Sequence, residues 1–322
     1  MRVTVTTGSR LHLGFTNLSD DLGRCYGSLG VAIDRPSTTV VVEEGEGADA
    51  LGDDAERVRA WRRRFCDRFG VDPHVSIAVR DCIPRHVGLG SGTQLALAVG
   101  RGLATVCGLD LSTAEIAAAL GRGRRSGVGV AAFTGGGFIV DAGHRAGATG
   151  EAAWPTIIWR RDFPSEWDIV VAVPEVTHRC SGRTEEGIFA KLSPSVRLSE
   201  EICRITQVQL LPALVERDLA GFGRALTAID RKTGRYFAAA QHGLFADAVA
   251  GEAIKVMLRA GAAGAGQSSW GPAVYGVVEE GAAGHVEETA RAFLAERGAR
   301  ALVFVARGRN TEARVEVEGA GS

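Results

Sequence analysis

The stretch of sequence that decides the fold is PRHVGLGSGTQLALAVGRGLATVCG, residues 84–108. It opens with a glycine-rich loop, GLGSGT at 88–93, and continues directly into an apolar helical pattern that begins near Thr93. Alternating glycines let the backbone turn tightly, and a helix N-terminus adds unpaired N–H groups and the positive end of its dipole. Such a loop can bind phosphate or diphosphate. From spacing alone, a structural turn capped by Thr93 fits equally well.

The loop differs from two common phosphate-binding motifs. No Gly-Lys-Ser or Gly-Lys-Thr follows it, which excludes a P-loop. It also lacks the GxGxxG spacing after a strand with an acidic residue about twenty positions further on, so a dinucleotide-binding fold is not indicated. Ser91 and Thr93 supply hydroxyl groups beside the backbone N–H groups.

The composition is that of an ordinary globular protein. The 322 residues are 45% hydrophobic and 23% charged, which excludes a disordered chain, a collagen-like repeat and a small disulfide-stapled protein. At about 150 residues per domain, the length indicates two domains. Lys and Arg number 37 against 38 Asp and Glu, so the chain lacks the basic excess typical of nucleic-acid binding.

No segment predicts export or membrane insertion. The first residues, MRVTVTTGSRLHLGF, alternate like a strand and lack the apolar core of a signal peptide. No apolar run approaches the roughly 18 residues of a spanning helix. The six cysteines are scattered without a CxxC pair, which is typical of reduced thiols. We therefore expect a cytoplasmic protein that binds no membrane.

Strand and helix patterns are interleaved along the chain, which predicts an α+β fold. A small, polar segment at 143–155 separates residues 1–150, the expected phosphate-loop domain, from residues 151–322, the expected second α+β domain. In the first domain, a capping box that begins at Ser112 predicts a helix reaching Arg125.

Two further stretches are rich in glycine. Residues 126–143, SGVGVAAFTGGGFIVDAG, read as a glycine-broken loop that enters a strand. Residues 264–276, GAGQSSWGPAVYG, form a second Gly/Ser loop before a strand. The tryptophan of this second loop, Trp270, is of a kind that stacks on aromatic ligands, although core packing suits it equally well.

Three ordered motifs resemble those of the GHMP kinase superfamily. PRHVGLGSGTQLALA at 84–98 resembles its phosphate loop, TGSRLHLGF at 7–15 stands where its first motif stands, and residues 264–276 resemble its third motif. The resemblance implies a two-domain α+β fold. An N-terminal ribosomal S5-like domain and a C-terminal ferredoxin-like domain are expected, with the site between them.

The chain departs from the kinases of that superfamily at two places. Those that use a catalytic base carry an Asp seven or eight residues before a glycine pair, where this chain has Gly129 and Val128. No carboxylate is therefore available there to take a hydroxyl proton. The phosphate loop also reads GTQ at 92–94 after Ser91, where kinases usually have Ser-Ser-Ala.

With these departures, SRLHLGF at 9–15, residues 121–143 and residues 266–276 resemble one non-kinase branch, the beta-ribofuranosylaminobenzene 5'-phosphate synthases. The resemblance implies transfer of a phosphoribosyl group from 5-phosphoribosyl 1-diphosphate to 4-aminobenzoate or 4-hydroxybenzoate. Diphosphate and carbon dioxide are released, in tetrahydromethanopterin biosynthesis. We expect Mg²⁺ and no organic cofactor, and superfamily analogy suggests a homodimer. An ATP-dependent small-molecule kinase and a non-catalytic phosphometabolite sensor remain the alternatives.

The candidate site residues lie on the strand at the N-terminus, in the two loops and at the arginine cluster. Arg10 and His12 share a strand face, and Arg125 belongs to a cluster at a predicted helix end, where cations also favour the dipole. We expect these three to be catalytic. The expected substrate-binding residues are Arg24, His86, Gly88, Gly90, Ser91, Gly92, Thr93, Gln94, Gln267, Ser268, Ser269 and Trp270. Weaker candidates are Arg85, Arg122, Arg124, His178 and Arg179, with Asp141, Glu175, Glu185 and Asp230 as acids for a metal whose ligands stay unassigned.

Overall fold

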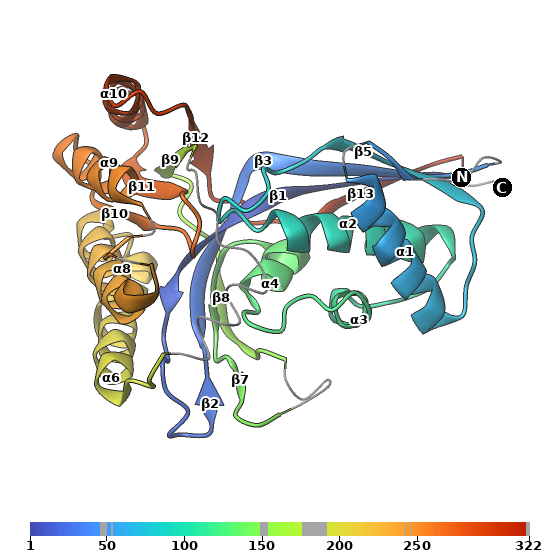
Figure 1. The fold of residues 1–322 in the computed structure, drawn as a ribbon, viewed down its shortest axis with the longest axis horizontal. Coiled ribbons are helices and arrows are strands. Elements are labelled where there is room, and N and C mark those ends of the chain that lie inside the picture. Colours follow the sequence, from blue (N-terminus) through green and yellow to red (C-terminus); the bar gives the residue numbers. More distant parts are fainter. Residues whose placement is uncertain are drawn as a thin grey trace.

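The computed structural model describes residues 1–45, 50–52, 54–148, 154–175, 192–241, 243–245 and 247–319. Within these residues, a mixed sheet and an antiparallel sheet lie side by side with their helices, and a long two-stranded ribbon runs from one to the other (Figure 1). None of the helices in the described part of the chain is both long and apolar enough to cross a bilayer.

The first sheet has seven strands in the order β13-β1-β3-β5-β4, with β6 pairing with both β3 and β8. Its strands are β1 (Arg2–Phe15), β3 (Ser28–Glu44), β4 (Ala50–Leu51), β5 (Val75–Asp81), β6 (Phe138–Asp141), β8 (Ile157–Arg161) and β13 (Arg314–Glu318). A separate two-stranded pair joins β2 (Arg24–Cys25) to β7 (His144–Arg145).

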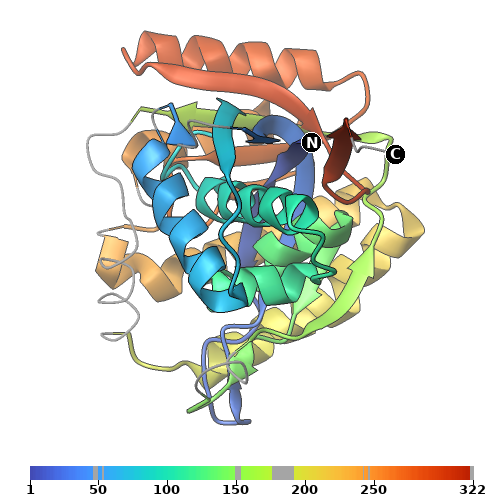
Figure 2. The same cartoon turned by 90° about the vertical axis from the view of Figure 1, so that its right-hand side faces the viewer.

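Strands from both ends of the chain complete this sheet. Arg2 pairs with Glu318, so the N- and C-terminal ends lie side by side, as Figures 1 and 2 show. The expected boundary near residue 150 falls among residues 149–153, outside the described residues. Both β8 and β13 follow that boundary and still join the first sheet, because their hydrogen-bonding partners are there.

Four helices pack on one face of the first sheet. They are α1 (Ala55–Phe69), α2 (Ser91–Val106), α3 (Thr113–Ala119) and α4 (Val128–Gly135). In Figure 2, the blue and teal helices α1 and α2 stand in front of the sheet. The predicted helix after the phosphate loop is confirmed, and its nearly continuous apolar sequence is buried because helices and sheet enclose it.

Two local expectations are wrong. The capping box at Ser112 forms as predicted, but α3 ends at Ala119 and not at Arg125. Gly121 and Gly123 have φ angles of +65° and +85°, a conformation that turns the chain back and ends the helix. Residues 128–135, expected as a loop, form α4, because their apolar residues pack into the core in spite of the glycines.

The second sheet has four antiparallel strands in the order β10-β11-β9-β12. The strands are β9 (Trp167–Pro174), β10 (Gly264–Gln267), β11 (Val274–Glu279) and β12 (Ala301–Arg307). The helices of this half are α6 (Val196–Ile205), α7 (Leu211–Glu216), α8 (Leu219–Gln241), α9 (Ala248–Arg259) and α10 (Ala283–Glu296), with a π-helical turn at Thr206–Leu210 between α6 and α7.

The second sheet is buried on both faces. Val170 and Ala172 of β9 pack with α9 and α10, whereas Ile169 and Val171 join the core formed with α8 and the first domain. This arrangement explains the apolar run IVVAVP at 169–174, because a strand covered on both sides has no polar face. The core around α8 also includes Leu11 of β1, so β1 connects the two domains.

Candidate active site

The phosphate loop adopts a conformation that its glycines permit. Gly88 and Gly90 have φ angles of +90° and +81°, and Gly90 precedes α2 as its N-cap. The backbone N–H groups of Thr93 and Gln94 donate to the carbonyl oxygen of Gly90, at 3.0 and 3.2 Å. The N–H groups at the very start of α2 have no partner within the helix, which suits an anion.

The second Gly/Ser loop packs directly on the phosphate loop and on β1. The Ser268 hydroxyl donates to the carbonyl oxygen of Gly88 at 2.7 Å and accepts from the His12 N–H at 3.0 Å. The Ser269 N–H donates to the His12 carbonyl oxygen at 3.1 Å, and Ser269 has a φ of +56°. A non-glycine residue in that conformation is strained, and such strain gathers at functional sites.

A cavity of about 630 Å³ opens between these loops and the helices of the first domain. Seven arginines from four parts of the chain line it, namely Arg10, Arg57, Arg64, Arg85, Arg122, Arg124 and Arg125. Within the described part of the chain, none of the residues that line it is Asp or Glu. The near-neutral net charge of the chain thus conceals a strongly cationic cavity, which favours a ligand with several negative charges.

Neighbouring groups hold several of these arginines in place. Asp54, which is almost fully buried, pairs with Arg57 at 2.8 Å and with Arg85 at 2.7 Å. Arg122 donates to the Thr93 hydroxyl at 3.4 Å. The guanidinium groups are therefore oriented before a ligand arrives, which reduces the conformational entropy lost on binding.

The cavity brings together most of the residues that the sequence singled out. Those lining it are Arg10, His12, Arg125, His86, Gly88, Gly90, Ser91, Gly92, Thr93, Ser269 and Trp270, with Arg85, Arg122 and Arg124 beside them. The prediction that Arg10 and His12 share a strand face is confirmed. The arginines after α3 lie in a loop, so helix-dipole stabilisation does not account for their position.

Four predicted substrate-binding residues lie outside the lining of this cavity, namely Arg24, Gln94, Gln267 and Ser268. Ser268 packs on the phosphate loop, and Gln267 lines a second cavity. The Arg24 guanidinium donates to backbone oxygens, including that of Gly143 at 2.7 Å. Gln94 is fully buried, where it donates to the Gly129 carbonyl oxygen and accepts from the Thr7 hydroxyl. The side chains of Arg24 and Gln94 therefore hold neighbouring backbone segments in place in this structure.

The described candidate metal-binding acids, Asp141, Glu175 and Asp230, do not line the arginine-lined cavity. Asp141 accepts hydrogen bonds from three backbone N–H groups and from the Ser126 hydroxyl, so its oxygens are satisfied by the protein. Glu175 follows β9, and its N–H donates to Arg300. The candidates Glu185, His178 and Arg179 lie outside the described residues. No cluster of three metal-ligating side chains occurs in the residues that the structure describes.

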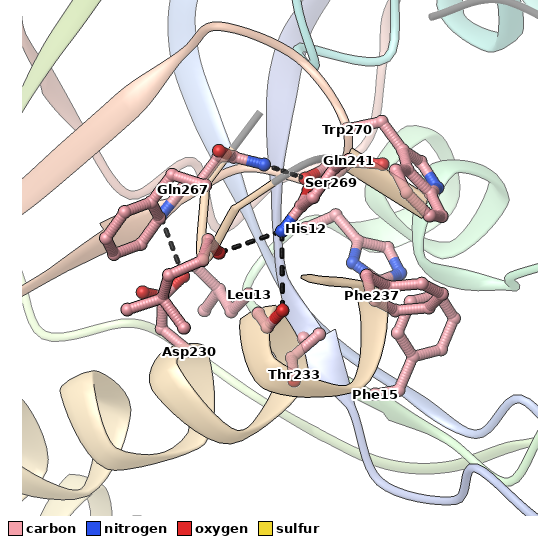
Figure 3. A pocket seen from close by; sticks show the side chains of 14 residues that line it. His12, Leu13, Phe15, Asp230, Thr233, Phe237, Gln241, Gln267, Ser269 and Trp270 are labelled. Atoms are coloured by element: carbon pink, nitrogen blue, oxygen red, sulfur yellow. Dashed lines mark hydrogen bonds between the residues drawn. The ribbon is translucent and has the colours of Figure 1, made fainter. Parts of the chain in front are cut away.

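A second, smaller cavity adjoins the first. It has a volume of about 30 Å³ and shares His12, Phe15, Ser269 and Trp270 with the arginine-lined cavity. Its remaining walls are Leu13, Gly14, Asp230, Thr233, Gly234, Phe237, Gln241, Leu244, Phe245 and Gln267. Figure 3 shows the labelled side chains of Phe15, Phe237 and Trp270 on one side of it and Asp230 on the other.

The aromatic walls form a continuous cluster. Ring centroids are 4.9 Å apart for His12 and Phe15, 5.5 Å for Phe15 and Phe237, and 4.4 Å for Phe237 and Trp270. Edge and tilted contacts of this kind favour a further aromatic ring. Trp270 packs in the core and also lines both cavities, and its stacking on an aromatic ligand stays a prediction.

Sequence reasoning missed several lining residues. Arg57 and Arg64 belong to a helix whose arginine-rich face resembles a solvated surface, and their spacing of seven was the one signal that they share a face. Phe15 and Phe237 resemble core residues. No local pattern indicated that α8 would bring Phe237 against the strand that carries Phe15.

His12 is expected to make stability sensitive to acid. Burial and then the positive charge of Arg10 lower the pKa of His12 from 6.5 to about 3. Between pH 6.5 and pH 3, His12 is protonated in the unfolded chain but stays neutral in the folded chain. The folded state is therefore fully stable with respect to His12 above pH 6.5, and its free energy of unfolding falls as the pH drops towards 3. Urea unfolding at pH 6.5, 5.5 and 4.5 should show His12→Gln losing stability less steeply than the wild type, by up to about 1.4 kcal/mol per pH unit. If the free energy of unfolding fell equally steeply with pH in both proteins, the lowered pKa of His12 would be contradicted.

Comparison with known proteins identifies relatives of the whole chain. The family model for the GHMP kinases N terminal domain matches residues 56–137, and that for the GHMP kinases C terminal matches residues 210–296. A "Beta-ribofuranosylphenol 5'-phosphate synthase" from Methanothermobacter thermautotrophicus is 37% identical over 87% of this chain and 90% of its own length. One of the same name from Archaeoglobus fulgidus is 35% identical, over 97% of this chain and 98% of its own.

Solved structures show the same fold at low identity. Homoserine kinase from Cytophaga hutchinsonii has a TM-score of 0.71 at 17% identity, covering 98% of this chain and 97% of that one. Mevalonate kinase from Methanococcus jannaschii has a TM-score of 0.69 at 16% identity, and the match covers 95% of this chain and 98% of that one. These similarities confirm the expected α+β fold with its two domains.

Proposed function

The chain belongs to the family of beta-ribofuranosylphenol 5'-phosphate synthases, within the GHMP kinase superfamily, and from that premise we propose its reaction. It joins the phosphoribosyl group of 5-phosphoribosyl 1-diphosphate to a para-substituted benzoate, with release of diphosphate and carbon dioxide, in tetrahydromethanopterin biosynthesis. The name of the relatives refers to a phenol, so 4-hydroxybenzoate is the first acceptor to test and 4-aminobenzoate the second.

The arginine-lined cavity is the observation that carries this proposal. The donor substrate has a phosphate at one end and a diphosphate at the other, and seven guanidinium groups around one cavity suit that charge. The phosphate loop and the start of α2 add backbone N–H donors. Because no carboxylate is among the described residues that line the cavity, none of those side chains would repel the substrate.

The bond changes suit a site without a base beside the phosphate loop. The ring carbon that bears the carboxylate attacks the anomeric carbon, whose bond to diphosphate breaks with its electron pair. The bond to the carboxylate then breaks, carbon dioxide leaves, and that electron pair restores the aromatic ring. No proton is removed from the attacking carbon, so Val128 and Gly129 can stand where kinases have an Asp. Positioning and neutralising the diphosphate are the main tasks.

The lining residues do not fit a Mg²⁺ ion held by the protein. The ion prefers oxygen ligands, chiefly carboxylates and water, and the donors lining this cavity are guanidinium, imidazole, hydroxyl and N–H groups. We therefore assign Mg²⁺ no resident site in the cavity and derive no step through it. A metal that accompanies the reaction would enter on the diphosphate oxygens as part of the substrate.

A release assay tests the proposal directly. Purified protein is incubated with 5-phosphoribosyl 1-diphosphate and carboxyl-labelled 4-hydroxybenzoate or 4-aminobenzoate, with and without Mg²⁺, and labelled carbon dioxide is counted. Release that requires both substrates is the expected result. Absence of release with both acceptors would contradict the proposal, and consumption of ATP with a small alcohol would then favour the kinase.

A further inference from the structure

Asp230 of α8 is a buried acid that the reaction described above does not use. It is 7% exposed and lines the small aromatic cavity. Its Oδ1 accepts a hydrogen bond from the Gln267 N–H at 2.8 Å, whereas its Oδ2 is buried without a partner. The hydroxyl of Thr233, one helical turn further along, is also buried without a partner and lines the same cavity. An unsatisfied buried carboxylate oxygen is costly, so it points to a ligand group that donates a hydrogen bond.

The size and position of the small cavity suit one end of an aromatic acid. A volume of about 30 Å³ admits a group the size of a water molecule but not a whole ring. The ring itself would lie against Phe15 and Trp270, the aromatic residues that the two cavities share. The carboxylate, at the opposite end of the ring, would then point into the arginine-lined cavity, towards the bound phosphoribosyl diphosphate.

We propose that Asp230 receives the para-hydroxyl group of the acceptor and takes its proton while the ring attacks. This inference rests on the proposed function. As the bond to the anomeric carbon forms, the hydroxyl oxygen supplies electrons to the ring and its proton passes to Oδ2 of Asp230, giving a neutral dienone. When carbon dioxide leaves, the electron pair returns through the ring to that oxygen, which recovers the proton. Asp230 ends as it began, and the proton balance of the reaction is unchanged.

The ionisation of Asp230 should be visible in the pH dependence of the reaction, because the groups described around it do not titrate in the same range. Burial raises its pKa to about 7, against the opposing effects of the Gln267 N–H and of Arg231. Among the residues that the structure describes, Tyr275 of β11 and His12 of β1 are the other titratable groups near it. Burial raises the pKa of Tyr275 well above 10, and His12 has a pKa of about 3, so neither changes charge between pH 5 and pH 9. In the wild type, kcat/KM should therefore rise with pH through about 7 as Asp230 becomes ionised.

The Asp230→Asn variant tests the proton transfer. The amide oxygen preserves the hydrogen bond from Gln267, so the variant should fold. With 4-hydroxybenzoate, we expect kcat to fall about 100-fold while KM changes less than about threefold, and the rise through pH 7 should disappear. With 3-fluoro-4-hydroxybenzoate, whose phenol ionises more readily, the loss should be about tenfold smaller, because less proton transfer is required. Asp168→Asn, which alters a buried acid of β9 that lines neither cavity, is the matched control and should retain wild-type kinetics.

The outcomes separate this inference from the proposed function. If the wild-type protein releases carbon dioxide and Asp230→Asn has the same kcat, the role of Asp230 is overturned and the proposed function stays intact. If the wild type releases no carbon dioxide, the proposed function fails, and acceptor binding is measured by quenching of tryptophan fluorescence. A preference for 4-hydroxybenzoate over benzoate that falls about fivefold in Asp230→Asn would still support the para-hydroxyl site. Equal preferences in the two proteins would overturn it.

Discussion

Gly88→Ala is expected to abolish turnover and to lower the free energy of unfolding by about 2–5 kcal/mol. At a φ of +90° any side chain is strained, and a Cβ at this position would lie 2.3 Å from the carbonyl oxygen of Ser268. The Gly88 backbone fixes the position of that Cβ and the oxygen belongs to the Ser268 backbone, so no side-chain rotation relieves the clash. The two loops must separate, and the phosphate loop then loses its position relative to β1.

The control for that variant is Gly284→Ala, in the first turn of α10. A Cβ there meets no atom within 4 Å, and the backbone is not left-handed. This variant should retain full activity and gain up to about 1 kcal/mol from helix propensity. Thermal unfolding and the carbon dioxide assay measure both proteins. A Gly88→Ala protein that keeps wild-type stability and turnover would show that the two loops are not rigidly packed.

Arg122→Met is expected to reduce kcat/KM for 5-phosphoribosyl 1-diphosphate by about 100-fold or more. The Arg122 guanidinium donates to the Thr93 hydroxyl at the start of α2, and one of its nitrogens would lie 2.9 Å from a Cβ placed on Gly92. It is therefore among the cations nearest to the phosphate loop, where we propose that the leaving diphosphate binds. Methionine keeps the length of the side chain and removes the charge.

Two further variants make this test specific. Arg122→Lys retains a cation without the two-pronged guanidinium geometry and should fall between the wild type and the methionine variant. Arg297→Met removes an exposed cation that pairs with Glu252 of α9 and should change nothing in the assay. Calorimetric titration with inorganic diphosphate measures the same site without turnover. Diphosphate affinity within about threefold of the wild type in Arg122→Met would place the diphosphate elsewhere in the cavity.

The elements that the sequence predicted correctly carry their signals locally. The alternating glycines before an apolar helix, the capping box at Ser112 and the apolar run of β9 each depend on residues close together in the chain. The errors arose where a local signal met a tertiary constraint. Residues 128–135 are rich in glycine and still form α4, because Val128 and Phe133 are buried against the core.

The candidate site divides in the same way. Sequence motifs located both loops and the strand that carries Arg10 and His12, because each motif is continuous along the chain. They did not show that Asp54 would hold Arg57 and Arg85 beside the phosphate loop. These ion pairs form because α1 packs close to the loop, and neither composition nor periodicity predicts that packing.

By itself, the sequence determined the α+β class, the phosphate loop and the family to which the chain belongs, since these follow from residue order. The tertiary structure alone decided that seven arginines from four segments surround one cavity, with no carboxylate among the lining residues that the structure describes. It also decided that Asp230 of α8 lies beside Trp270 and His12 in the walls of a second cavity. The physical reason is that backbone turns and periodicity depend on near neighbours, whereas the charge and shape of a cavity depend on groups that packing brings together from distant parts of the chain.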